Sequence, residues 1–121
     1  MGKTALIVDD SISIRQMVAF TLNQAGFTVL EGGNGEEALS RLEGQRVDLI
    51  ITDLNMPVMD GLKFIRAVRS RPATKFTPVL MLTTESQASK KQEGKAAGAT
   101  GWIVKPFHPV KLLEVIGKVL P

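Results

Sequence analysis

The sequence contains no cysteine, few aromatic residues and no long apolar run. Without cysteine the chain cannot form a disulfide scaffold, a thiolate metal site, an iron–sulfur cluster or a cysteine nucleophile. Its apolar runs, such as residues 49–51, are far shorter than the roughly 20 residues that a membrane-spanning helix needs. The first ten residues reach the charged pair Asp9-Asp10, which is not typical of a signal peptide. These absences favour a soluble, cytoplasmic protein that is not inserted in a membrane.

The chain carries only a small excess of positive charge. Its 15 lysines and arginines outnumber its 12 aspartates and glutamates, giving a formal net charge of +3. A nucleic-acid-binding protein usually concentrates basic residues on one element, with aromatic residues between them. Here the basic residues are scattered, for example over residues 63–75 and 90–95, and only 5% of the chain is aromatic. This pattern is typical of solvated helix faces, so no nucleic-acid partner is expected.

Length and composition fit one globular domain covering residues 1–121. The chain is 44% hydrophobic and 22% charged, the proportions of a folded rather than a disordered protein. Apolar, strand-like runs alternate with amphipathic, helix-like stretches. The expected strands are residues 4–8, 27–30, 47–52, 78–83 and 102–104. The expected helices are residues 14–25, 35–43, 62–69, 86–97 and 110–120.

This alternation predicts an α/β protein with a doubly wound parallel sheet. Strands that are apolar on both faces and separated by helices are typical of a five-stranded parallel sheet with five helices covering both sides. The pattern of strands and helices leaves the strand order open. Ligands of such folds bind beyond the carboxyl ends of the strands, so the residues at these ends are the candidates for function.

Five polar residues lie at the ends of four predicted strands. They are Asp9 and Asp10 after the first strand, Asp53 after the third, Thr83 at the fourth and Lys105 after the fifth. Carboxylates this close repel each other, by roughly 3 kcal/mol for each pair at ~5 Å and an effective dielectric of ~20. A hard divalent cation offsets this repulsion, and Mg²⁺ suits carboxylates combined with a phosphate group. Lys105 and Thr83 offer a cation and a hydroxyl to phosphoryl oxygens.

The sequence resembles the receiver domain of two-component response regulators, and most of all the single-domain chemotaxis regulators of that family. The motifs that carry the resemblance are Val8-Asp9-Asp10-Ser11, Asp53-Leu54-Asn55-Met56-Pro57 with Asp60-Gly61, Leu82-Thr83, and Lys105-Pro106-Phe107. The resemblance covers essentially the whole chain. It implies a flavodoxin-like sheet in the order 2-1-3-4-5, phosphorylation of Asp53, and a cis peptide bond between Lys105 and Pro106.

The resemblance also implies roles for the other residues at the strand ends. The Mg²⁺ ligands would be Asp9, largely through water, Asp10, Asp53 and the backbone carbonyl of Asn55. Lys105 would contact the phosphoryl group, and Thr83 would move toward it. Trp102, which stands where chemotaxis members commonly have tyrosine, would then turn inward. This switch would change the surface of the fourth helix, fifth strand and fifth helix, over residues 86–120.

By this resemblance the chain is a signalling switch rather than an enzyme. A sensor histidine kinase, of the chemotaxis type, would donate the phosphoryl group. The chain would accept it stoichiometrically and catalyse its own phosphorylation and dephosphorylation. Asn55 and Glu85 would lie near the path of the hydrolytic water, which predicts a short-lived phosphoryl group. The phosphorylated form would bind a downstream target protein.

Three alternatives remain open at the level of the sequence. The chain could be a phosphorelay intermediate that passes its phosphoryl group to a histidine phosphotransfer domain. It could be a Mg²⁺-dependent phosphatase with an aspartate nucleophile, although such enzymes often carry a second acid where this chain has Asn55. Its basic charge is also compatible with a nucleic-acid-binding module.

Overall fold

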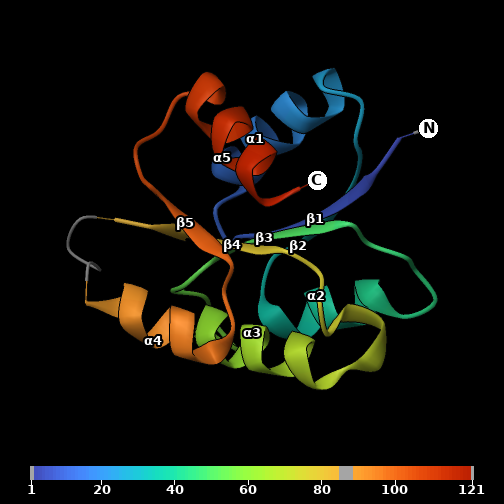
Figure 1. Ribbon diagram of the computed structural model, residues 1–121, viewed down its shortest axis with the longest axis vertical. Coiled ribbons are helices and arrows are strands. Elements are labelled where there is room, and N and C mark those ends of the chain that lie inside the picture. Colours follow the sequence, from blue (N-terminus) through green and yellow to red (C-terminus); the bar gives the residue numbers. More distant parts are fainter. Residues whose placement is uncertain (1, 85–88, 121) are drawn as a thin grey trace.

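The computed structural model describes residues 2–84 and 89–120, which form alternating strands and helices (Figure 1). The strands are β1 (Thr4–Val8), β2 (Thr28–Gly32), β3 (Leu49–Asp53), β4 (Val79–Thr83) and β5 (Gly101–Val104). The helices are α1 (Ile12–Gln24), α2 (Gly35–Leu42), α3 (Gly61–Ser70), α4 (Lys90–Ala97) and α5 (Pro109–Val119). A short 3-10 helix, η1 (Pro72–Thr74), was not expected from the sequence and precedes β4.

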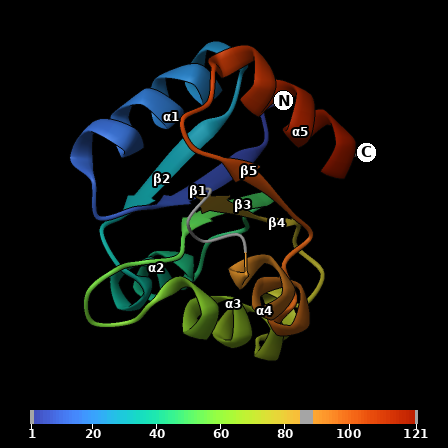
Figure 2. The same cartoon turned by 90° about the vertical axis from the view of Figure 1, so that its left-hand side faces the viewer.

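The five strands form one parallel sheet in the order β2-β1-β3-β4-β5. Helices α1 and α5 cover one face of the sheet, and α2, α3 and α4 cover the other (Figure 1, Figure 2). The predicted doubly wound α/β class and the strand order implied by the resemblance are therefore confirmed. Within the described residues, no helix is long and apolar enough to cross a membrane.

The sheet separates two hydrophobic cores because its central strands are apolar on both faces. β3 and β4 are buried along their whole length. Ile50 of β3 and Met81 of β4 join the core beneath α2, α3 and α4. Ile51 and Leu80 instead join the core beneath α1 and α5. Successive side chains on a strand point to opposite faces, so each strand stabilises both layers.

The element boundaries differ slightly from the sequence predictions. β2 extends to Gly32 and β3 to Asp53, because backbone pairing with the neighbouring strands continues to these residues. The helix expected at residues 86–97 corresponds to α4, which begins at Lys90; residues 86–88 lie outside the described part of the chain. Asp53 is thus the last residue of a buried strand rather than the first residue of a loop.

Polar side chains fix the starts of the three helices that follow β1, β2 and β3. Ser11, Asn34 and Asp60 each accept a hydrogen bond from the backbone N–H three residues further on. Such caps satisfy N–H groups that the first helical turn leaves unpaired. Each cap therefore determines where the chain turns back from the carboxyl edge of the sheet.

At the opposite edge of the sheet, Arg69 of α3 clamps several loops together. Its guanidinium donates to the carbonyl oxygens of Gly98 at 2.9 Å, Thr74 at 3.1 Å and Thr77 at 2.6 Å. Gly98 ends α4 with a φ angle of 116°, a left-handed conformation that favours glycine. The clamp therefore joins the end of α4 to α3 and to the loop before β4.

The first residue of α3, Gly61, packs against the main chain that carries Asp53. The N–H of Gly61 donates to the carbonyl oxygen of Leu54 at 2.8 Å. A Cβ atom at position 61 would overlap the carbonyl oxygen of Asp53 and lie 2.8 Å from the Cα atom of Leu54. Only glycine therefore allows α3 to begin this close to the end of β3.

This close approach predicts opposite effects for two glycine-to-alanine substitutions. Gly61→Ala should lower the free energy of unfolding by about 1–3 kcal/mol, because the backbone must move to admit the methyl group. Gly117→Ala in α5 should raise it by about 0.5–1 kcal/mol, because a Cβ there meets nothing within 4 Å and alanine is the better helix former. Urea denaturation measures both changes. Equal changes in the two variants would contradict the packing of Gly61.

Candidate functional site

The sheet brings the predicted site residues together at its carboxyl edge. Asp9 follows β1, Asp53 ends β3, Thr83 ends β4 and Lys105 follows β5. One carboxylate oxygen from each of Asp9, Asp10 and Asp53 lies within 4.8 Å of the other two. Asp9 and Asp53 are buried, whereas Asp10 is exposed. The site is therefore a three-carboxylate cluster that opens to solvent on the side of Asp10.

Lys105 supplies a positive charge inside this cluster. Its Nζ atom lies 3.2 Å from Oδ1 of Asp53 and 3.4 Å from Oδ2 of Asp9. The lysine side chain is largely buried, so its attraction to both carboxylates is screened less than that of a surface ion pair. The peptide bond between Lys105 and Pro106 is cis, as the resemblance implied.

The environment of Asp53 opposes its ionisation. Burial raises the pKa of the Asp53 carboxyl above its ordinary value of 3.8, and the nearby negative charge of Asp9 raises it further. The positive charge of Lys105 and a hydrogen bond from the N–H of Leu54 to Oδ1, at 2.9 Å, act in the opposite direction. Asp53 is therefore a carboxylate whose negative charge costs free energy in the folded protein.

Two hydrogen bonds hold Asp9 in place in the turn after β1, one to its side chain and one to its backbone carbonyl. Its Oδ1 atom accepts a hydrogen bond from the N–H of Ser11 at 2.9 Å. Its carbonyl oxygen accepts one from the guanidinium of Arg15 at 2.7 Å, and Arg15 also pairs with Glu31 at 3.0 Å. Arg15 was not predicted from the sequence, because its role depends on how α1 and β2 lie relative to each other.

Of the two residues assigned to a switch, Thr83 lies at the carboxyl edge and Trp102 lies two residues before the end of β5. Oγ1 of Thr83 is buried and has no hydrogen-bond partner among the described residues. An unpaired buried hydroxyl is costly, so it indicates a place where a ligand oxygen would be favourable. Trp102 on β5 is 40% exposed, and Nζ of Lys91 lies 5.2 Å from the centre of its ring.

Of the two residues expected near the path of the hydrolytic water, Asn55 is exposed two residues after Asp53, and Glu85 lies outside the described residues.

The donor atoms of the cluster fit a hard divalent cation. Carboxylate oxygens are the ligands that Mg²⁺ and Ca²⁺ prefer, and a bound cation would offset the repulsion among three nearby carboxylates. Asp10 and Asp53 reach the cluster from the ends of the neighbouring strands β1 and β3, and Asp10 is exposed to solvent. The acidic cluster could therefore hold a metal ion.

The raised pKa of Asp53 predicts how its replacement changes stability with pH. Between the ordinary pKa and the raised one, the folded state binds more protons than the unfolded state, so stability falls as the pH rises through the folded pKa. Asp53→Asn removes this cost. In buffer with a metal chelator, it should therefore make the protein more stable than the parent at pH 7. The gain should shrink as the pH falls toward 3.8.

Chemical denaturation of both proteins at several pH values measures this difference. The matched variant Asp48→Asn, at the opposite end of β3, should not show the same pH-dependent gain. A parent protein more stable than Asp53→Asn at pH 7 would contradict the cost assigned to the Asp53 charge.

Comparison with known proteins identifies the family. The response regulator receiver domain model matches residues 5–117. The chemotaxis protein CheY of Pseudomonas aeruginosa is 40% identical over 115 residues, which make up 94% of this chain and 93% of that protein. The phosphate regulon transcriptional regulatory protein PhoB of the same organism is 36% identical over 120 residues, and this chain spans 52% of its length.

Solved structures agree with this assignment. The chemotaxis response regulator CheY4 of Vibrio cholerae is 56% identical and superimposes with a TM-score of 0.94, covering 99% of this chain and 100% of that one. The receiver domain of the Pseudomonas aeruginosa sensor histidine kinase PA1611, determined with a magnesium ion in its active-site cleft, is 25% identical. Its TM-score is 0.89, with 98% of each chain covered. The family match, the identity to CheY proteins and the CheY-like fold together show that this chain belongs to the response regulator receiver domain family of two-component signalling.

Proposed function

We propose that Asp53 accepts a phosphoryl group from a phosphohistidine of a sensor kinase and that the phosphorylated chain acts in chemotaxis signalling. The observation that carries the proposal is the cluster of Asp9, Asp10, Asp53 and Lys105, together with the buried hydroxyl of Thr83, which has no hydrogen-bond partner in the described part of the chain. The CheY and CheY4 relatives support the chemotaxis part, because both are chemotaxis proteins aligned over nearly their whole length. The kinase partner would then be of the chemotaxis type.

Asp53 is the nucleophile in this proposal. Its Oδ1 atom accepts from the N–H of Leu54 and contacts Lys105, so Oδ2 is the oxygen that we expect to attack. Attack forms an O–P bond as the P–N bond to the kinase histidine breaks. The electron pair of that bond stays on the histidine nitrogen, which takes up a proton. The positive charge of Lys105 favours the ionised form of Asp53 for this step and acts against the effect of burial on its pKa.

The residues that would hold Mg²⁺ are Asp9, largely through water, Asp10, Asp53 and the backbone carbonyl of Asn55. When bound, the cation neutralises charge on phosphoryl oxygens in a transfer that depends mainly on positioning and electrostatics. The magnesium ion in the related PA1611 receiver domain supports this choice of metal. The exposed carboxylate of Asp10 would bind it from the solvent side of the cluster, and the buried Asp9 from the protein side.

After transfer, the chain's own donors would bind the phosphoryl oxygens. Lys105 already reaches Asp53, so its ammonium can move to an oxygen of the new group. Thr83 has a buried hydroxyl to donate to another oxygen. We expect its movement to leave space for Trp102 to turn inward. This change would alter the surface formed by α4, β5 and α5.

The altered surface includes a groove along β5 and α5. The groove has a volume of about 890 Å³ and is lined by Trp102, Val104 and Phe107 together with the basic residues Lys111 and Lys118. A target protein would bind here in one phosphorylation state. In this role the chain is a stoichiometric phosphoacceptor that catalyses its own phosphorylation and dephosphorylation, rather than an enzyme with an external substrate.

Loss of the acceptor carboxylate should abolish phosphorylation. Asp53→Asn should take up no label from radioactive acetyl phosphate with Mg²⁺, because an amide is not a nucleophile of this kind. Asp48→Asn removes a carboxylate just before the start of β3, away from the cluster, and should be labelled like the parent. Labelling of Asp53→Asn at the parental rate would contradict the proposal.

Metal binding should stabilise the folded chain. At a Mg²⁺ concentration 100 times the dissociation constant, the free energy of unfolding should rise by about 2.7 kcal/mol, and a chelator should remove the gain. Asp10→Asn should lose most of this gain, whereas Glu43→Gln, an exposed carboxylate outside the cluster, should keep it. Thermal unfolding with and without Mg²⁺ measures the effect. An equal Mg²⁺ response in Asp10→Asn and the parent would exclude Asp10 as a ligand.

A further inference from the structure

Lys91 on α4 and Trp102 on β5 form a contact that the proposed phosphorylation chemistry does not use. Nζ of Lys91 lies 5.2 Å from the centre of the Trp102 ring, within the range of a cation–π interaction. Lys91 is partly buried, whereas its neighbour Lys90 is exposed and pairs with Glu93 at 3.3 Å. Two adjacent lysines on one helix therefore have different partners.

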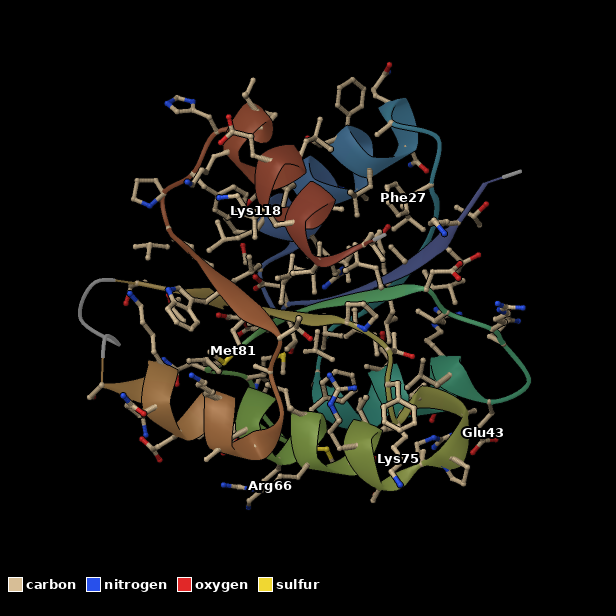
Figure 3. The ribbon with its side chains drawn as sticks, in the orientation of Figure 1. Phe27, Glu43, Arg66, Lys75, Met81 and Lys118 are labelled. Carbon is tan, nitrogen blue, oxygen red and sulfur yellow. The ribbon has the colours of Figure 1, made fainter. Side chains whose placement is uncertain are left out.

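The position of Trp102 links this contact to the phosphorylation site. Trp102 pairs in register with Met81, and Thr83 pairs with Val104, two residues further along each strand. Met81 lies between the sheet and the layer of α3 and α4, where Gly94 of α4 approaches its sulfur (Figure 3). Since residues two apart on a strand share a face, Trp102 and Thr83 lie on the face that α4 covers.

Few other interactions of the described residues hold α4 near Trp102. The buried residues of α4 are Gly94 and Ala97, both small. Ser89, at its start, makes no capping hydrogen bond with its side chain. The contact between Lys91 and the Trp102 ring therefore joins the beginning of α4 to β5, one turn before the packing of Gly94 on Met81.

We propose that Lys91 is a latch that holds Trp102 at the surface and so disfavours the phosphorylated-like state of the switch. This inference rests on the proposed function, in which Trp102 turns inward when Asp53 is phosphorylated. Turning inward takes the ring away from Lys91, so the contact stabilises the outward state alone. A phosphoryl group must then supply the free energy that breaks the contact. Lys91 is thus a positioning residue for the switch.

Thermodynamic linkage makes the latch measurable. An interaction present only in the outward state lowers the apparent affinity for any ligand that favours the inward state. An exposed cation–π contact of ordinary strength corresponds to a factor of about two to five in such an equilibrium. Removing the charge of Lys91 should therefore tighten binding of a phosphoryl analogue by that factor.

The experiment compares Lys91→Met with Lys91→Arg and the matched control Lys90→Met. Trp102 is the only tryptophan in the chain, so intrinsic fluorescence reports its position directly. We would titrate each protein with beryllofluoride, a phosphoryl analogue, in the presence of Mg²⁺. Lys91→Met should bind about two- to fivefold more tightly than the parent, and acrylamide should quench its Trp102 less before the analogue is added. Lys91→Arg keeps a cation over the ring and, like Lys90→Met, should behave as the parent does.

The possible outcomes separate the latch from the function on which it rests. Equal beryllofluoride affinities and equal quenching in Lys91→Met and Lys90→Met would overturn the latch, provided that the parent responds to the analogue. If the fluorescence of Trp102 in the parent does not change at saturating beryllofluoride, the switch assigned to Trp102 is wrong, and the latch proposal is then wrong as well. Denaturation curves of all four proteins distinguish a shift of the switch from a general loss of stability.

Discussion

The ion pairs of Lys105 with Asp9 and Asp53 are the interaction on which the rest of the site depends. Two buried carboxylates would otherwise repel each other in an environment that already penalises charge. A single ammonium within 3.4 Å of both makes their ionised forms tolerable. The same ammonium is placed where a transferred phosphoryl group would develop negative charge. In the proposed function, one cation thus stabilises the folded site and also serves the phosphoryl transfer.

The ion pairs of Lys105 require the backbone that carries Asp9 and Asp53 to be held in a fixed position. Asp53 belongs to the last position of a fully buried strand, and Gly61 permits α3 to start against its carbonyl oxygen. Arg15 holds the carbonyl oxygen of Asp9 while it pairs with Glu31 of β2. Asp53 therefore sits on a regular strand, and hydrogen bonds hold Asp9 in the turn after β1, which keeps the two carboxylates close enough to share a cation.

Much of the fold could be predicted because its signals are local. Apolar runs on β3 and β4 and helical spacing in α1, α3 and α5 indicate elements without knowledge of their neighbours. Because parallel strands end at one edge, the placement of Asp9, Asp53, Thr83 and Lys105 followed from the same pattern. Strand order did not follow from periodicity, and it required the resemblance to known receivers.

The interactions that could not be predicted connect residues far apart in the chain. Nothing in the local sequence distinguishes Lys91 from Lys90, yet one lies over Trp102 and the other pairs with Glu93. In the sequence, Arg15 and Arg69 likewise look like other solvent-exposed basic residues of amphipathic helices. The role of Arg15 depends on the packing of α1 on β2, and that of Arg69 on the packing of α3 beside α4. The short 3-10 helix before β4 has no periodicity long enough to detect.

The clamp made by Arg69 has a mechanical consequence for α4. Its guanidinium fixes the carbonyl oxygen of Gly98, so the end of α4 remote from the phosphorylation site is anchored to α3 and to the loop before β4. Near the opposite end of the helix, Lys91 lies over the ring of Trp102, and none of residues 90–93 is fully buried. A helix fixed at one end behaves as a lever about that pivot, and its displacement grows with distance from Gly98. In the proposed switch, the greatest displacement would therefore fall beside Trp102, where a partner would sense it.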